Sequence, residues 1–469
     1  MPSPLAISLA ALTAASLAAA SPLRTPAETQ PSAVVVPLKR RANAHSPTQR
    51  RDLESFKRKA KAMKAKYGAK GGDTASAAAG NEKRQHSIDM TSYQDSEWYG
   101  EIDVGTPPTA FSVVLDTGSS DLILAEPDCN GCQSTTPGYD PTSSSTSSTS
   151  QASFSITYGS GSGSGSLVRD TVSIANYTQP EQIFAACSTL ENIVDGTISG
   201  ILGLGWQGIA SSRAVPLVES LANNGSLPEQ VFGFAFETHT FTTASPTTAP
   251  GGTLTIGGVD TSAYSGSINW VDIVQPAGYW AIPLDATTVN GQDVGVSSSN
   301  AVIDTGTTLI GMPTSAVRAI YSQISGAQAI NLDGESGYYA IDCSASINVN
   351  FTFGGVEYSI DPNQFNAGAV DSRGTQCLGA IFALETGSTS TIDTIIGDAF
   401  LTGVYNAYRF SDPPAVGFAT LGSGGTANTG SSSTATKTSG STSRSSSNLV
   451  FSAKGVAAAL VAVVGALLA

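Results

Sequence analysis

One apolar stretch that ends in an Asp-Thr-Gly turn occurs twice in this 469-residue chain. The first copy, residues 113–120, is VVLDTGSS, and the second, residues 301–308, is AVIDTGTT. Apolar runs of this length before turn residues indicate buried strands, and glycine lets the backbone turn where a Cβ would clash. Two copies with the same lead-in indicate a duplicated lobe. We therefore expect two related lobes, each presenting one carboxylate on a rigid, buried loop.

The rest of the body also follows a β pattern. Short alternating or apolar runs, such as residues 100–104, 154–158 and 348–353, are separated by Gly, Asn, Asp and Pro. Charged residues make up only 13% of the chain and there are 49 glycines, which favours a turn-rich secreted protein over a helical one. Within the body, helical patterns are convincing only at residues 214–223 and 314–324. We expect an all-β, bilobal fold.

The charge of the chain is divided sharply between a basic front and an acidic body. Residues 1–85 hold 15 Lys/Arg and 5 Asp/Glu, which leaves 8 Lys/Arg and 32 Asp/Glu for the remainder. Such an acidic body would repel phosphate, so a nucleic-acid partner is excluded. Acid conditions suit it, because partial protonation of its carboxylates relieves self-repulsion.

The front of the chain is expected to direct the protein to secretion and then to inhibit the body until it is processed. Residues 1–20 are apolar and end in three alanines, as in a secretory signal peptide; a transmembrane helix is a poorer interpretation, because the run is short and interrupted by Ser and Thr. Residues 21–84 are interpreted as a basic pro-segment whose cations cover an acidic cleft. Lys83-Arg84 predicts cleavage by a dibasic-processing protease, with Gln85 as the mature start.

Within the pro-segment, residues 51–67 could form a basic helix. Its apolar residues Leu53, Phe56, Ala60 and Met63 fall near one face. The alternative is a disordered basic tail.

The end of the chain has the layout of an anchoring signal. Residues 423–455 are mostly Ser, Thr and Gly with no Asp or Glu, as in a flexible stalk that O-glycans could decorate. Residues 456–469 form an apolar tail too short to span a bilayer, which needs about 20 residues. Small residues, a polar spacer and such a tail are the pattern of a GPI signal, with Ser445 as the expected attachment residue. A short tail-anchor helix is the alternative.

The five cysteines and three sequons predict further covalent features. Cys129 and Cys132 could form a redox or zinc pair, but a structural disulfide is expected in a secreted chain, and Cys343–Cys377 is expected to be the other bridge. Cys187 lies in an apolar run and is interpreted as a buried small hydrophobe. The glycan acceptor sequons are at Asn176, Asn224 and Asn350.

Two carboxylates that share one buried site suggest a chemistry. They cannot both ionise easily, so the pair holds a single proton. One carboxylate can take a proton from a water that attacks an amide carbonyl, while the other gives a proton to the carbonyl oxygen. This reaction requires neither a metal nor another cofactor.

The chain resembles the pepsin-like aspartic proteases over about residues 90–422. The resemblance is carried, in order, by six segments. They are WYGEI…VGTPP at 98–108, DTGSSDL at 116–122, SITYGSG at 155–161, GILGLG at 200–205, DTGTT at 304–308 and IIGDAFL at 395–401. The resemblance implies a double β-barrel with lobes at residues 85–274 and 275–422, a cleft between them, and extended peptides or proteins as substrates.

The resemblance also assigns roles. Asp116 and Asp304 would be the catalytic dyad. Thr117 and Thr305 would hydrogen-bond to each other across the lobes. Ser119 and Thr307 would donate to the outer carboxylate oxygens, while Gly118 and Gly306 would let their amides approach the carboxylates. Tyr158, Gly159 and Ser160 would belong to a flap over the substrate. The family usually has Trp where this chain has Ile123, so we expect Tyr158 to be held differently or to be more mobile. Ser160 replaces the flap Asp that favours Lys substrates in some fungal relatives.

The sequence thus predicts a monomeric aspartic endopeptidase, made as a zymogen and active at acid pH. Its layout resembles the fungal GPI-anchored branch that includes the yapsins, which implies a location on the extracellular face of the plasma membrane or in the cell wall. The alternative is a catalytically inactive relative that binds or builds the cell wall. A homodimeric protease of the retroviral kind is excluded, because both Asp-Thr-Gly loops lie in one chain.

Overall fold

A computed structural model describes residues 53–67, 86–93, 97–158, 161–194, 196, 198–238, 250–296, 299–332, 334–386 and 392–422. All of them belong to one compact unit. The signal peptide, the Lys83-Arg84 site, the stalk, Ser445 and the apolar tail lie outside the described residues, as do Gly159 and Ser160 of the expected flap.

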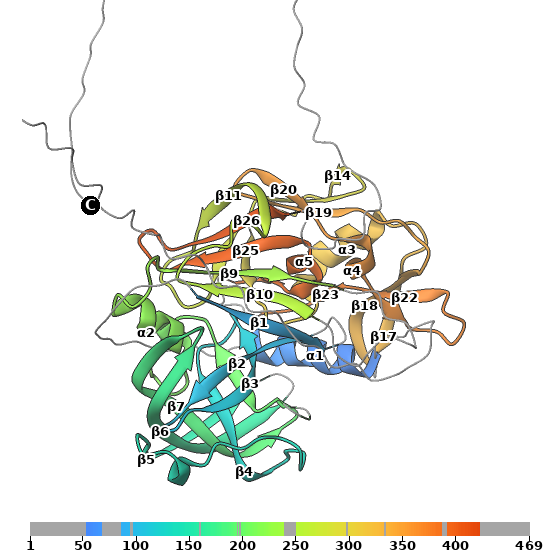
Figure 1. The fold of residues 1–469 in the computed structure, drawn as a ribbon. Coiled ribbons are helices and arrows are strands. Elements are labelled where there is room, and N and C mark those ends of the chain that lie inside the picture. The colour runs from blue at the N-terminus through green and yellow to red at the C-terminus, as the bar shows by residue number, and fades with distance from the viewer. Residues whose placement is uncertain are drawn as a thin grey trace, which may run out of the picture. The chain divides into compact units, whose positions relative to one another are not determined.

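The largest sheet has 13 strands in the order β11-β26-β25-β9-β10-β1-β2-β3-β8-β4-β7-β6-β5 (Figure 1). Its strands are β1 (His86–Tyr93), β2 (Glu97–Val104), β3 (Thr109–Asp116), β4 (Leu122–Asn130), β5 (Ser148–Thr157), β6 (Ser162–Ile174), β7 (Tyr177–Glu191), β8 (Gly200–Gly203), β9 (Val231–Phe236), β10 (Pro250–Ile256), β11 (Tyr264–Asp272), β25 (Val404–Arg409) and β26 (Ala415–Leu421). The chain leaves this sheet after β11, close to the lobe boundary expected at residue 274, and returns to it with β25 and β26.

Three smaller sheets are built from the segment between β11 and β25. Their orders are β12-β15-β24-β16-β23, β14-β13-β19-β20 and β17-β18-β22-β21. The strands are β12 (Ala281–Leu284), β13 (Ala286–Val289), β14 (Gln292–Asp293), β15 (Ser299–Ile303), β16 (Ile310–Met312), β17 (Gln328–Leu332), β18 (Glu335–Asp342), β19 (Val349–Phe353), β20 (Val356–Ser359), β21 (Asn366–Ala369), β22 (Gln376–Gly379), β23 (Ile381–Ala383) and β24 (Thr394–Ile396). This mostly β architecture confirms the predicted fold class.

Helices are short and few among the described residues. They are α1 (Leu53–Tyr67), α2 (Leu217–Asn223), α3 (Thr314–Ser322), α4 (Pro362–Phe365) and α5 (Asp398–Leu401), with 3-10 turns at Pro141–Ser143 and Gln207–Ile209. The two helices expected in the body appear as α2 and α3, and the expected basic helix appears as α1. None of the helices described here is long and apolar enough to cross a membrane.

The two Asp-Thr-Gly loops have the same strand environment. β3 runs parallel to β8, with Asp116 opposite Gly203, and the Leu204 amide donates to the Asp116 carbonyl at 2.8 Å. β15 runs parallel to β24, and the Asp304 amide donates to the Ile396 carbonyl at 3.0 Å. Each Asp-Thr-Gly loop is therefore backed by an apolar-apolar-Gly segment, residues 201–203 or 395–397, and the duplication is visible in the structure.

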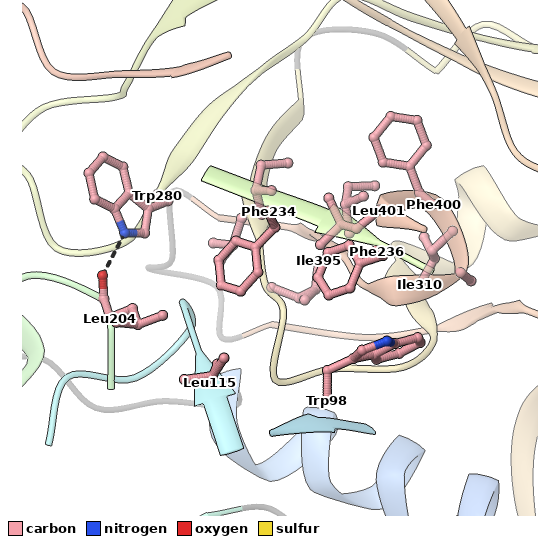
Figure 2. Packing of buried hydrophobic residues seen from close by; sticks show 14 of the residues in the cluster. Trp98, Leu115, Leu204, Phe234, Phe236, Trp280, Ile310, Ile395, Phe400 and Leu401 are labelled. Carbon is pink, nitrogen blue, oxygen red and sulfur yellow. Dashed lines mark hydrogen bonds between the residues drawn. The ribbon is translucent and has the colours of Figure 1, made fainter. Parts of the chain in front are cut away.

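Buried aromatic and aliphatic side chains from both halves of the chain form the main core (Figure 2). Phe234 and Phe236 stack with centroids 5.3 Å apart, and Trp98 packs edge-on against Phe236. Trp280 donates from Nε1 to the Leu204 carbonyl at 2.9 Å, as the dashed line in Figure 2 marks. This bond joins the segment that backs the first Asp-Thr-Gly loop to the residue that precedes β12.

Candidate active site

Asp116 and Asp304 are both buried, and each is held by its own loop in the same way. The Gly118 amide donates to Asp116 Oδ1 and the Gly306 amide donates to Asp304 Oδ1, both at 2.9 Å. The hydroxyl group three residues after each aspartate, on Ser119 or Thr307, donates to Oδ2 at 2.5 Å. These are the supports expected from the sequence, because an ionised carboxylate needs donors when it is removed from water.

Thr117 and Thr305 tie the two loops together. Each threonine amide donates to the hydroxyl of the other, at 3.1 and 3.0 Å. Each hydroxyl in turn donates to a main-chain carbonyl of the opposite strand, Thr117 to Ile303 at 2.8 Å and Thr305 to Leu115 at 2.7 Å. The two loops therefore form one hydrogen-bonded unit.

Each loop glycine faces the carboxyl group of the other loop. A Cβ built on Gly118 would collide with the Asp304 carboxyl group, and one on Gly306 would collide with that of Asp116. Glycine is required at both positions so that the two carboxyl groups can share one site.

The end of α1 lies on this pair of carboxylates. Lys66 Nζ is 2.9 Å from Asp116 Oδ1, 3.2 Å from Asp116 Oδ2 and 3.1 Å from Asp304 Oδ2. The Tyr67 hydroxyl donates to Asp304 Oδ2 at 2.7 Å, and its ring packs 5.4 Å from the ring of Tyr279. Lys66 thus occupies the space in which a water and a substrate carbonyl would have to sit.

The apolar side of α1 is buried beneath this contact. Ala60, Met63 and Tyr67 are buried, so Ala60 and Met63 lie on the inner face that the sequence indicated. Met63 fits where Gly311 leaves room, since a Cβ on Gly311 would come within 2.5 Å of its sulfur. α1 is blue in Figure 1 and lies close to β17 and β18.

The carboxyl groups have different pKa values because Lys66 and burial act on them unequally. Burial alone would raise the pKa of Asp304, but the charge of Lys66 and the hydrogen bonds from Asp116, Thr307 and Tyr67 lower it to about 2. For Asp116, burial and the neighbouring Asp304 outweigh Lys66, so its pKa is raised.

Lys66 itself is held in its charged form. Burial alone would lower the pKa of Lys66, but the charges of Asp116 and Asp304 outweigh burial and raise it. A buried ammonium is stable only when it is paired in this way. The site is therefore closed by an ion cluster that depends on ionised carboxylates.

Tyr158 is placed beside the dyad by the β5–β6 hairpin, whose turn is closed by the Tyr158 amide bonding the Gly161 carbonyl at 2.8 Å. Its ring is buried in a small cluster with Ile123 and Cys187. Its hydroxyl makes no hydrogen bond of normal geometry, although Ser119 lies close enough to influence its pKa, which burial raises.

Comparison with known proteins identifies this arrangement. A family model described as "Eukaryotic aspartyl protease" matches residues 97–421. The chain belongs to the eukaryotic aspartyl protease family. It is 36% identical over 342 residues to major aspartyl peptidase 1 of Cryptococcus neoformans var. grubii, covering 70% of each chain. It is 32% identical over 326 residues to pepsin A of Rhinolophus ferrumequinum, covering 68% of this chain and 80% of that one. The protein is an aspartic-type endopeptidase.

The cysteines of this aspartyl protease form the two predicted bridges, Cys129–Cys132 and Cys343–Cys377. Cys187 is a free, fully buried thiol, and burial raises its pKa to about 12. Among the described residues, no cluster of three or more His, Cys, Asp or Glu is arranged to hold a metal ion.

The three sequons differ in exposure. Asn176 is exposed in a tight turn between β6 and β7. Asn224 is half-buried, and its amide donates to Gln179 Oε1 at 2.8 Å. Asn350 is buried in β19, where its amide donates to Thr288 at 3.1 Å. Because the Asn350 side chain is buried within a sheet, it has no room for a glycan, so only Asn176 and Asn224 remain proposed glycosylation sites.

Sequence reasoning missed Lys66 and Tyr67 as the residues that reach the dyad. It predicted a basic helix ending at Tyr67 and a cleft covered by its cations, but seven Lys or Arg residues within 51–67 were equivalent candidates. A usable signal was Lys66-Tyr67, the one Lys-Tyr pair of that helix, which places an ammonium group and a phenol next to each other at the helix end.

Proposed function

We propose that the protein is a secreted aspartic endopeptidase, held on the cell surface, made as a zymogen and active at acid pH. The observation that carries the zymogen proposal is Lys66, whose ammonium lies within 3.1 Å of an oxygen of each aspartate. A site filled in this way cannot admit a peptide bond. Enzymes of the pepsin family pass through the secretory pathway, which agrees with a signal peptide at residues 1–20.

In the released enzyme, Asp116 and Asp304 would share one proton and hold a water between them. The ionised carboxylate takes a proton from the water as its oxygen attacks the carbonyl carbon, and the protonated one gives its proton to the carbonyl oxygen. Collapse of the tetrahedral intermediate returns that proton and transfers the other to the leaving nitrogen as the C–N bond breaks. The Thr117–Thr305 unit keeps the two carboxyl groups in register during these transfers.

Activation would occur in two stages. Acid weakens the ion cluster on Lys66, and a dibasic-processing protease cuts after Lys83-Arg84. The acidic body and the basic front of the chain attract each other at neutral pH, so the pro-segment stays on the cleft during transit. Sequencing the N-terminus of the secreted protein tests this proposal, which predicts Gln85 as the first residue; a start at Ser21 would contradict it.

The surface location rests on residues 423–469, whose composition is that of a stalk followed by a GPI signal. We propose attachment at Ser445 and the membrane or the cell wall as the final location, as in the yapsin-like branch. Release of the protein from intact cells by a phosphatidylinositol-specific phospholipase is the expected result. Retention after this treatment, with release by detergent alone, would favour a tail-anchor helix.

The catalytic proposal is tested with the mature protein and a denatured protein substrate at low pH. Cleavage should be blocked by pepstatin and lost in Asp116→Asn, which keeps a side chain of similar size but replaces the carboxyl group with an amide that cannot take up or give the proton. Asp293→Asn is the matched control, because Asp293 is an exposed aspartate on β14. Full cleavage by Asp116→Asn would refute the mechanism.

A further inference from the structure

Lys64 makes a second set of contacts on the protease body, two residues before the lysine that covers the dyad. Its ammonium is 3.0 Å from Glu335 Oε2 at the start of β18. It also lies 5.0 Å from the ring centre of Tyr338 and 5.8 Å from that of Phe382. A carboxylate and two aromatic faces around one ammonium are a binding site for a cation.

The two aromatic rings are fixed before any ligand arrives. Tyr338 and Phe382 stack with their centroids 5.5 Å apart and their planes 14° apart, and both are buried. Glu335 is accessible, with 46% of its side chain exposed. The site therefore combines rigid walls with a carboxylate that solvent and ligands can reach.

Space for a side chain adjoins this site. A cavity of about 430 Å³ is lined by Lys64 of α1, by Thr314 and Arg318 of α3, and by Gly337, Tyr339, Ala383 and Glu385. Glu385 is already bonded by the amide and hydroxyl of Thr314. Glu335 and Glu385 carry two negative charges against one positive charge on Arg318, so the neighbourhood becomes net negative when α1 and Lys64 leave.

The position of this site relative to the dyad suggests what it binds in the active enzyme. Lys66 lies on Asp116 and Asp304; Lys64 precedes it by about 3 Å along the helix axis and about 200° around it, so its side chain leaves α1 on a different side. A peptide that replaces α1 at the dyad would run through the same region, since an extended chain advances about 3.3 Å per residue. A residue a few positions from the scissile bond would then reach Glu335.

We propose that Glu335, Tyr338 and Phe382 form a subsite that selects a lysine or arginine side chain of the substrate, and that Lys64 occupies this subsite in the zymogen. The proposal rests on the proposed function, because it requires that α1 leaves and a peptide takes its place. It assigns a preference for basic substrates to the C-terminal half of the cleft, and Ser160 of the expected flap plays no part in it.

The test uses the mature enzyme and a peptide library in which each position around the scissile bond is varied. Wild-type enzyme should prefer Lys or Arg over the uncharged norleucine at one position other than those flanking the cut. At that position, Glu335→Gln should lower kcat/KM for the Lys peptide roughly five-fold, as expected for one partly exposed ion pair. It should leave the norleucine peptide unchanged. Glu335→Lys should shift the preference towards Glu.

Glu357→Gln is the matched control, because Glu357 is an exposed glutamate in a different sheet, on β20; its profile should equal that of the wild type. Cleavage of the library by the wild type without any basic preference would overturn the proposal and leave the proposed function intact. An equal loss of the Lys and norleucine peptides in Glu335→Gln would also overturn it. If no peptide is cleaved at all, the proposed function fails and the subsite proposal fails with it.

Discussion

Thr117 and Thr305 donate their amide hydrogens to each other's hydroxyl oxygens, at 3.1 and 3.0 Å. Both residues are buried, and each hydroxyl donates a hydrogen bond to a main-chain carbonyl of the opposite strand. Every donor and acceptor in this crossing is therefore satisfied by the other half of the chain. The register of the two carboxyl groups depends on this unit rather than on either loop alone.

Thr117→Val should separate the loops without changing the size of the side chain. The Thr305 amide and the Ile303 carbonyl would each lose a partner in a buried site, which costs about 1–3 kcal/mol per group. We expect the free energy of unfolding of the mature protein to fall by about 3 kcal/mol, together with a lower kcat. Thr420→Val, at an exposed position of β26, should stay within about 0.5 kcal/mol of the wild type in the same denaturant titration.

The sequence predicted these catalytic loops well because their pattern is local and occurs twice. An apolar strand, an aspartate and an obligatory glycine lie within eight residues, so strand, turn and carboxylate can be inferred together. The backing segments at 200–205 and 395–401 carry a similarly local pattern. Their distance from the loops in the sequence could be bridged only by resemblance to the family.

The parts that sequence reasoning missed depend on contacts between distant segments. Lys66 reaches Asp304 across 238 residues, and apart from the tyrosine that follows it nothing local distinguishes it from the other cations of α1. Burial of Asn350 likewise follows from the pairing of β13 with β19, which the sequon itself does not reveal. The pairing of β9 with β25 also joins segments far apart in sequence.

Gly306→Ala should abolish catalysis rather than folding. The added Cβ would meet the Asp116 carboxyl group, so the dyad must spread, and a misplacement of about 1 Å at reacting groups costs about 100-fold in rate. We expect kcat to fall at least that far. Gly225→Ala is an informative control. No atom lies within 4 Å of a Cβ built on Gly225, but its φ is +73°. The variant should therefore lose stability while its kcat is unchanged. A Gly306→Ala enzyme with normal kcat would contradict the close approach of the loops.

The two disulfides should contribute unequally to stability. Cys343–Cys377 spans 34 residues and Cys129–Cys132 spans three, and loop-closure entropy grows with loop length. The chain-entropy relation gives about 4 kcal/mol for the long loop and about 1.5 kcal/mol for the short one. Paired Cys→Ala variants at each bridge, compared in denaturant under oxidising conditions, should show the larger loss for Cys343 and Cys377. Equal losses would show that the short bridge does more than close a loop.

Lys66→Gln should weaken the binding of the pro-segment to the catalytic dyad. The variant leaves two buried carboxyl groups without their counterion, and truncating one partner of a buried ion cluster costs about 3–5 kcal/mol. We expect the full-length precursor to cleave a fluorogenic peptide at a higher pH than the wild-type precursor does. Lys61→Gln is the matched control, because Lys61 is on the same helix but exposed. The same pH for all three precursors would show that Lys66 does not close the site.

Acid should release the pro-segment over a window set by Asp304. Its pKa with α1 in place is about 2, below the ordinary aspartate value of about 3.9, so the closed form binds fewer protons than the open one. The stabilisation is therefore complete above about pH 4 and is lost as the pH falls through about 2. The raised pKa of Asp116 acts in the opposite sense and offsets part of this loss, so the release is assigned to protonation of Asp304. The initial rate at which intact precursor cleaves a fluorogenic peptide should rise as the pH falls between these limits. A precursor that is already half-active at neutral pH would show that the ion cluster does not close the site.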